Sequence, residues 1–311
     1  MKIVFLDKKT LGDDINLDKF GELGEVEYFD ATAATQTLER VQNADIVVTN
    51  KVVIDKEIMS QTNIKLICIT ATGMNNVDLE YAKEKAIEVK NVVGYSTSSV
   101  AQLAFSYILQ FVQHINFYND FVQNGGWEQS DIFTNNDKAF YELHGKTIGI
   151  IGLGNIGKEV AKIASAFGCK VIYYSTSGKN TNTEYESVAL EYLLKNADII
   201  SIHCALNPQT NNLVNKENLP LLKKGAILMN LGRGGLVNEQ DITNTLNNKQ
   251  DIYFATDVAT VEPIEKTSPL LQIEDKKRVI ITPHIAWASK EARERLMDTV
   301  YTNIKESICK V

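Results

Sequence analysis

Apolar and polar residues alternate along this chain in a pattern that predicts strands and helices in turn. Before residue 95, short apolar runs are separated by stretches with helical spacing, and a second series of such runs follows residue 146. Strands that alternate with helices predict parallel sheets covered by helices on both faces. The predicted strands are Lys2–Leu6, Glu25–Phe29, Asp45–Val48, Ile64–Ile69 and Ile87–Val92, then Thr147–Ile151, Lys170–Tyr174, Asp198–His203, Ala226–Asn230, Ile252–Val258 and Val279–His284.

Two helical segments lie outside these series. Apolar residues keep a helical period over Ser96–Gln123, which predicts one long helix, and the polar run Gln129–Lys138 predicts an extended connection after it. A terminal amphipathic helix is predicted over Glu291–Ile308, and we expect it to return to the first domain. The expected domains are therefore residues 1–97 plus 288–311, and residues 98–287.

A glycine-rich turn opens the second series. Gly152, Gly154 and Gly157 follow the strand Thr147–Ile151 directly and begin a helix that leads to the strand Lys170–Tyr174. This G-x-G-x-x-G spacing lets backbone amides approach a pyrophosphate at the helix N-terminus. The alternative is a turn that only packs a helix closely on a strand. Because the whole β-α-β unit is present, we predict an α/β protein with two doubly wound, Rossmann-like parallel sheets, a dinucleotide in the second, and a cleft between the domains.

Composition and charge limit the partners. The chain has 311 residues, 44% hydrophobic and 23% charged, which is enough for two globular domains. A net charge of -7 without basic blocks argues against nucleic acid and anionic membranes. The N-terminal apolar run is too short for a signal peptide, so we expect a soluble, cytoplasmic protein. Four cysteines are scattered without a C-x-x-C pair, and we expect neither a disulfide nor a metal.

Three residues beyond predicted strand ends are candidates for chemistry. Arg233, flanked by glycines, could grip a carboxylate with its planar fork, although it could also be a surface arginine in a turn. Glu262 could be a solvated loop carboxylate, or it could bond one ring nitrogen of His284 and orient the imidazole for proton transfer. Carboxyl ends of parallel strands share one sheet edge, so we expect all three near the glycine turn.

These segments together resemble the D-isomer-specific 2-hydroxyacid dehydrogenases over nearly the whole chain. The resemblance implies a substrate domain built from both termini, an inserted cofactor domain and a homodimer. It also implies that Arg233, Glu262 and His284 form the catalytic set. The residues that carry it are Ala71-Thr72-Gly73 with Asn76-Val77-Asp78, the turn from Gly152 to Gly157, Asn230 to Gly234, Asp257-Val258 with Glu262-Pro263, and Thr282-Pro283-His284.

The same resemblance supplies candidate contacts for ligands. We expect a loop of the first domain to bind the substrate carboxylate and the second domain to bind the cofactor. The substrate loop is Thr72, Gly73, Met74 and Asn75. The cofactor candidates are Gly152, Gly154, Asn155, Ile156, Gly157, Ser175, Thr176, Lys179, Cys204, Leu231, Gly232, Asp257 and Trp287.

Substrate and cofactor choice stay more open. The HIAWAS and ATGMNNVDLEYAK segments look most like the glycerate dehydrogenase or hydroxypyruvate reductase branch, which implies reduction of hydroxypyruvate or glyoxylate to the D-2-hydroxy acid. The alternatives are a nucleotide-sensing corepressor of this fold and a formate dehydrogenase, whose branch carries glutamine at the place of Glu262. The cofactor is NAD(H) or NADP(H). Ser175 stands where a ribose-binding aspartate is usual, which predicts that NADPH is accepted.

Overall fold

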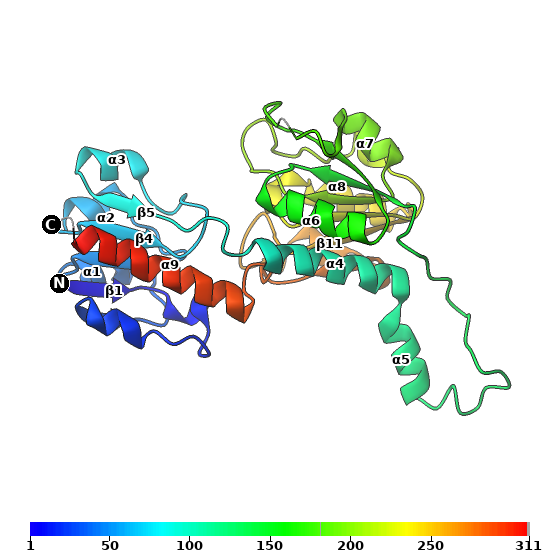
Figure 1. The fold of residues 1–311 in the computed structure, drawn as a ribbon, viewed down its shortest axis with the longest axis horizontal. Coiled ribbons are helices and arrows are strands. Elements are labelled where there is room, and N and C mark those ends of the chain that lie inside the picture. Colours follow the sequence, from blue (N-terminus) through cyan, green and yellow to red (C-terminus); the bar gives the residue numbers. More distant parts are fainter. Residues whose placement is uncertain (181, 310–311) are drawn as a thin grey trace. The chain divides into compact units, whose positions relative to one another are not determined.

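The computed structural model describes residues 1–180 and 182–309, and the chain forms two compact units. The first unit contains Met1–Ser96 and the chain from Trp287 onward, and the second contains Thr97–Ala286 (Figure 1). Each unit has its own parallel sheet, covered by helices. This arrangement confirms the predicted α/β class with two doubly wound sheets.

The first unit is built on a five-stranded sheet of order β2-β1-β3-β4-β5, in which every neighbouring pair is parallel. The strands β1, β3 and β4 are almost wholly apolar because both of their faces are covered. Their bounds are β1 Lys2–Phe5, β2 Glu25–Tyr28, β3 Ile46–Thr49, β4 Leu66–Ile69 and β5 Glu88–Lys90. The helices are α1 Thr37–Val41, α2 Lys56–Ser60, α3 Leu79–Glu84 and α9 Lys290–Ile308.

The terminal helix α9 completes the core of this unit. Leu296, Val300 and Ile304 recur every four residues, and they are fully buried against strands β1, β3 and β4. Figure 1 shows α9 lying beside β4, although the two are far apart in the sequence. Burial of an aliphatic side chain stabilises by about 1.5–3 kcal/mol, so this stripe anchors the helix.

The second unit contains a seven-stranded parallel sheet of order β12-β11-β10-β9-β6-β7-β8. From β6 the chain winds one way to β7 and β8 and the other way through β9 to β12, which creates a switch point at the carboxyl end of β6. The strands are β6 Thr147–Ile151, β7 Lys170–Tyr174, β8 Glu186–Ser187, β9 Ile199–Ile202, β10 Ala226–Asn230, β11 Ile252–Thr256 and β12 Val279–Ile281. The helices are α4 Thr97–Gln113, α5 Ile115–Gln123, α6 Asn155–Ala166, α7 Leu190–Asn196 and α8 Glu239–Asn247.

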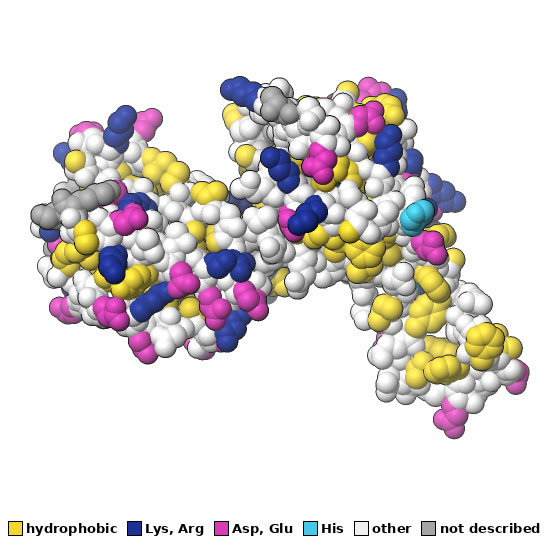
Figure 2. Space-filling model, in the orientation of Figure 1, with side chains coloured by type: hydrophobic (Ala, Val, Ile, Leu, Met, Phe, Trp, Pro, Cys, Tyr) yellow, Lys and Arg dark blue, Asp and Glu magenta, His cyan; other side chains and the backbone are white. Residues whose placement is uncertain are grey.

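The prediction of a single long helix over Ser96–Gln123 was wrong. Helix α4 ends at Gln113, His114 takes a left-handed conformation with φ 52°, and α5 starts at Ile115 in a new direction. A residue in the left-handed conformation breaks a helix, and here that residue is a histidine rather than the glycine that would have indicated a break in the sequence. Helix α5 and the loop after it form an arm, residues 115–142, whose surface carries gathered hydrophobic side chains (Figure 2).

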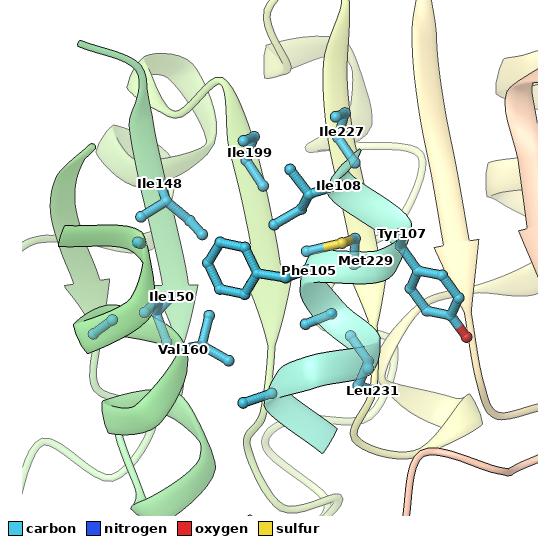
Figure 3. Packing of buried hydrophobic residues seen from close by; sticks show 14 of the residues in the cluster. Phe105, Tyr107, Ile108, Ile148, Ile150, Val160, Ile199, Ile227, Met229 and Leu231 are labelled. Atoms are coloured by element: carbon cyan, nitrogen blue, oxygen red, sulfur yellow. The ribbon is translucent and has the colours of Figure 1, made fainter. Parts of the chain in front are cut away.

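Helix α4 packs across one face of the second sheet. Figure 3 shows Phe105 and Ile108 of α4 pointing at the isoleucines of β6, β9 and β10. Phe105 also stacks on Phe167, with ring centroids 5.4 Å apart. This packing fixes α4 across the face of the sheet. Among the described residues no helix is long and apolar enough to span a membrane.

Candidate active site

The glycine turn lies at the switch point, between β6 and α6. Gly152 has φ +92°, and a Cβ there would stand only 2.7 Å from the backbone nitrogen of Cys204. A Cβ at Gly157 would overlap the carbonyl of Gly152, so helix and strand approach closely. By contrast, a Cβ at Gly154 would meet nothing within 4 Å. The turn is therefore closed toward the protein and open toward solvent where α6 begins, which fits a phosphate group at that helix N-terminus.

The loop after β7 carries the candidate contacts to the adenosine side. Ser175 Oγ is buried, and it has no hydrogen-bond partner in the part of the chain that the structure describes. The turn closes with a bond from Gly178 N to Ser175 O of 3.2 Å, and Asn180 Nδ2 donates to Leu153 O at 2.7 Å. Thr176 is half-buried and Lys179 is exposed. The end of β7 therefore carries no carboxylate, and its first loop residue has a hydroxyl without a partner; cofactor contact by this loop stays a prediction.

The loop after β10 holds Arg233 on the surface. The buried Asn230 at the end of the strand accepts from Gly232 N at 3.1 Å and donates to Arg233 O at 2.8 Å. The guanidinium makes one bond of 2.8 Å, from Nη1 to Gly232 O, and the side chain is exposed. Asn230 therefore fixes the backbone while the planar fork stays open to a ligand.

Glu262 and His284 meet as the sequence analysis expected. His284 Nδ1 lies 2.7 Å from Glu262 Oε2, and Glu262 Oε1 accepts the backbone N–H of Ala259 at 3.0 Å. His284 has a left-handed backbone with φ 54°, which is uncommon outside glycine and marks a residue constrained by its loop. This pairing orients the imidazole and leaves Nε2 as the atom that can serve a substrate oxygen.

Asp257 holds the backbone of the His284 loop. Its carboxylate is 1% exposed, and it accepts from Ile285 N at 2.8 Å, from Ala286 N at 2.7 Å and from the Thr282 hydroxyl. Burial raises the pKa of the Asp257 carboxyl, and these hydrogen bonds oppose the rise. The Tyr107 hydroxyl bonds Thr282 Oγ1 and extends the network to α4. Cofactor contact by Asp257 stays a prediction.

Other candidate residues occupy different settings. Leu231 and Cys204 are buried beside the glycine turn, and burial raises the pKa of the Cys204 thiol to about 11, so it is protonated at neutral pH. Trp287 belongs to the first unit, where its ring meets Tyr95 edge-on at 6.3 Å. The Thr72–Asn75 loop also lies in the first unit, after β4, and Thr72 Oγ1 donates to Val92 O at 2.9 Å. Substrate contact by this loop stays a prediction.

Sequence reasoning did not identify three residues that support the site: Tyr107, Thr282 as a hydrogen-bond donor, and Glu239, which contacts the Glu262 loop. Tyr107 fits the apolar stripe of α4 and gives no sign of its polar partner. Glu239 follows a helix cap, where acidic residues are common for another reason. In the described ranges no cluster of metal-binding side chains occurs.

A parallel sheet with a glycine turn at its switch point, and an arginine, a glutamate and a histidine on neighbouring loops, defines a nicotinamide-dependent dehydrogenase. Comparison with known proteins gives the family. Residues 105–286 match the model of the D-isomer specific 2-hydroxyacid dehydrogenase, NAD binding domain. The chain belongs to the D-isomer-specific 2-hydroxyacid dehydrogenases, and it is an NAD(P)-dependent oxidoreductase that acts on D-2-hydroxy acids.

Its similarity to single proteins extends over almost the full length. A hydroxypyruvate reductase from Blautia hydrogenotrophica is 41% identical, covering 98% of this chain and 96% of that protein. A glycerate dehydrogenase from Methylorubrum extorquens is 34% identical over 98% and 95%. Among solved structures, an acyclic imino acid reductase in complex with NADPH and D-Arg has a TM-score of 0.85 at 29% identity, covering 100% of this chain and 98% of that one. These relatives confirm the predicted family and branch.

Proposed function

We propose that this enzyme reduces a short 2-oxo acid, hydroxypyruvate or glyoxylate, to the D-2-hydroxy acid. The observation that carries the proposal is the 2.7 Å contact of His284 Nδ1 with Glu262 Oε2. These two residues and the exposed Arg233 follow the carboxyl ends of three neighbouring strands, β12, β11 and β10, of the same sheet. The names of the two relatives, hydroxypyruvate reductase and glycerate dehydrogenase, support the substrate class.

The proposed mechanism assigns one task to each side chain. Arg233 binds the carboxylate of the oxo acid and orients the neighbouring carbonyl with its planar fork. Protonated His284 donates from Nε2 to the carbonyl oxygen as it becomes a hydroxyl, while Glu262 holds Nδ1–H and stabilises the charged ring. Bound reduced nicotinamide supplies the hydride. In the oxidation direction His284 accepts the proton from the same oxygen.

The substrate assignment is tested by steady-state turnover with a panel of 2-oxo acids. We expect hydroxypyruvate and glyoxylate to have higher kcat/KM values than pyruvate or a branched 2-oxo acid, and the product to be the D isomer. A preference for a bulky 2-oxo acid, or formation of the L isomer, would contradict the proposal. Absence of turnover with every 2-oxo acid, together with tight nucleotide binding, would favour the nucleotide-sensing alternative.

The cofactor proposal is that NADPH is accepted at least comparably to NADH. The Gly152–Gly157 turn would hold the pyrophosphate, with the backbone of Asn155 and Ile156 nearest to it. Rotation of the buried, unpaired Ser175 hydroxyl toward solvent, beside Thr176 and Lys179, would let it bond a 2′-phosphate, and no carboxylate stands there to repel it. The NADPH bound by the imino acid reductase is consistent with this choice for a chain of the same fold.

The proposed assembly is a homodimer formed through the arm. Apolar side chains are exposed along it, and Phe133 is 87% exposed. An apolar surface of this kind marks an interaction site, and the family resemblance favours a second copy of the chain as its occupant. We expect a dimer in sedimentation equilibrium and a weaker dimer for Phe133→Asp, whereas a wild-type monomer at micromolar concentration would refute the proposal. The exposed residues are Ile115, Val122, Trp127, Ile132, Phe133, Phe140 and Tyr141.

The cytoplasmic location also remains a proposal. Cys68, Cys169, Cys204 and Cys309 are all free thiols, which is the usual state of cysteines in a reducing compartment. Localisation of a tagged full-length protein by cell fractionation would test it, and recovery in an extracellular fraction would contradict it.

A further inference from the structure

The loop that carries Glu262 contacts helix α8 and the loop after β10 that carries Arg233. Glu239, the first residue of α8, accepts the backbone N–H of Thr260 through Oε1 at 2.6 Å. Gly234 packs so closely on the same loop that a Cβ there would overlap the backbone of Ala259. The loop therefore has one polar and one steric support, and the polar support is a carboxylate.

Two consecutive backbone N–H groups of this loop donate to two different glutamates. Ala259 N donates to Glu262 Oε1 at 3.0 Å, and the next amide, Thr260 N, donates to Glu239 Oε1. Glu262 Oε2 then meets His284 Nδ1 at 2.7 Å. These two amides belong to adjacent peptide planes that share the Cα of Ala259, so Glu239, by fixing the second plane, limits the freedom of the first, whose N–H orients the Glu262 carboxylate.

Glu239 lies at the start of a helix that is capped and packed. The side chain of Asn238 caps α8 by accepting Asp241 N at 3.0 Å, and Ile242 and Leu246 bury the inner face of the helix. The backbone from which the Glu239 carboxylate reaches Thr260 N is therefore fixed by the cap and by the packing of α8, so the carboxylate can define the position of the loop.

We propose that Glu239 is a positioning residue for the reduction, which holds the loop so that the Glu262 carboxylate faces His284. Glu239 touches neither substrate nor cofactor in this role. The inference rests on the proposed function of Glu262 and His284, and it adds a residue that neither the family resemblance nor the sequence pattern assigns.

A competing explanation is that Glu239 only stabilises α8. An acidic residue in the first turn of a helix interacts favourably with the helix dipole, and this effect depends on its charge rather than on its reach. Two substitutions separate the explanations. Glu239→Asp keeps the charge but shortens the side chain by one methylene, and Glu239→Gln removes the charge but keeps the Oε1 acceptor at the same reach.

The experiment measures kcat and KM for the 2-oxo acid with both variants of the full-length enzyme. We expect Glu239→Asp to lower kcat about tenfold with KM within about twofold, because misplacement of a catalytic pair affects the chemical step. Glu239→Gln should stay within about twofold of wild type. The reverse order, with Asp active and Gln impaired, would overturn the proposal in favour of the helix dipole. Glu291, exposed in the first turn of α9, provides the matched control, and Glu291→Asp and Glu291→Gln should leave kcat unchanged.

Coupling to Glu262 provides the second criterion. In a Glu262→Gln background, the further change Glu239→Asp should alter kcat by less than about twofold, because the pair that it positions is already impaired. An independent tenfold loss in that background would refute positioning through Glu262. If Glu262→Gln alone leaves kcat unchanged, the proposed role of Glu262 fails and this inference fails with it. If Glu262→Gln is impaired and Glu239→Asp is normal, only this inference fails. Should Glu239→Asp not fold, Glu239→Ala replaces it under the same criteria.

Discussion

Replacing Asp257 by asparagine should both destabilise the second unit and slow catalysis. Asparagine has nearly the same shape, but one of its two terminal atoms donates instead of accepting. In the structure Asp257 Oδ1 accepts from Ile285 N at 2.8 Å and from Thr282, and Oδ2 accepts from Ala286 N at 2.7 Å. The amide oxygen can replace only one of these positions, so the Nδ2 group faces a backbone donor.

The size of the effect follows from these contacts. If the amide oxygen takes the Oδ1 position, two bonds change from charged to neutral and lose about 1 kcal/mol each, and the orphaned N–H of Ala286 costs about 1–3 kcal/mol. Burial of the Asp257 charge is itself unfavourable, as the raised pKa of this carboxyl indicates. The neutral asparagine avoids that desolvation cost, which offsets part of the loss. We therefore expect a net destabilisation of about 2–4 kcal/mol. Thr282→Val removes the hydroxyl that donates to Asp257 and contacts the Tyr107 hydroxyl but leaves the backbone donors paired, so it should cost about 1–3 kcal/mol.

Urea denaturation and steady-state kinetics provide the assays. Asp257→Asn should lower kcat on the order of ten- to a hundredfold, because His284 lies between Thr282 and Ile285 on the same loop. Asp13→Asn, at an exposed position, is the control and should change stability by less than about 0.5 kcal/mol. An Asp257→Asn enzyme as stable and as active as wild type would show that these hydrogen bonds do not hold the loop.

Three further predictions address other parts of the site. Arg233→Lys should lose kcat/KM about as severely as Arg233→Ala, because an ammonium lacks the bidentate fork; near-normal efficiency in either variant would remove Arg233 from the mechanism. Ser175→Asp should lower kcat/KM for NADPH on the order of tenfold, about 1.4 kcal/mol, with a smaller effect for NADH, and a strong wild-type preference for NADH that this change leaves unaltered would refute the cofactor proposal. Burial lowers the pKa of His203 from 6.5 to about 4, so as pH falls the unfolded chain binds a proton at this residue before the folded protein does. The free energy of unfolding should therefore fall by up to about 3 kcal/mol between pH 6.5 and pH 4. A His203→Phe variant should lack that part of the fall.

The fold was predictable because its strongest signals are local. The strands β3, β6 and β10 are short apolar runs, and each follows or precedes a recognisable helix. The glycine turn was equally visible, since its spacing, its strand and its helix are contiguous. The break at His114 was not predictable, because apolar periodicity continues across α4 and α5 and only a backbone angle separates the two helices.

The candidate catalytic residues were also within reach of the sequence. Glu262 and His284 are 22 residues apart, yet they follow strands that are neighbours in a parallel sheet. Because the carboxyl ends of parallel strands lie at one edge of the sheet, the sequence was sufficient to pair them. The contact of Tyr107 with Thr282 joins residues 175 positions apart, on a helix and a strand end. Neither residue type nor spacing indicates which buried tyrosine forms a hydrogen bond with a threonine hydroxyl, so such a pair can be identified only from the tertiary structure.

The loops of the second unit that carry Arg233 and His284 are each fixed by a polar residue at or just after the end of a buried strand. Asn230 closes β10 and binds both ends of the Arg233 turn, while Asp257 follows β11 and binds the His284 loop. Both are 1% exposed, whereas Arg233 is exposed and His284 is half-buried. A buried polar group remains only where its hydrogen bonds offset desolvation, so these two residues make the loop backbone rigid without occupying the site. A polar residue that ends an otherwise apolar parallel strand is therefore a sequence signal for a positioning role, and it is the signal by which the holding function of Asn230 and Asp257 could have been inferred.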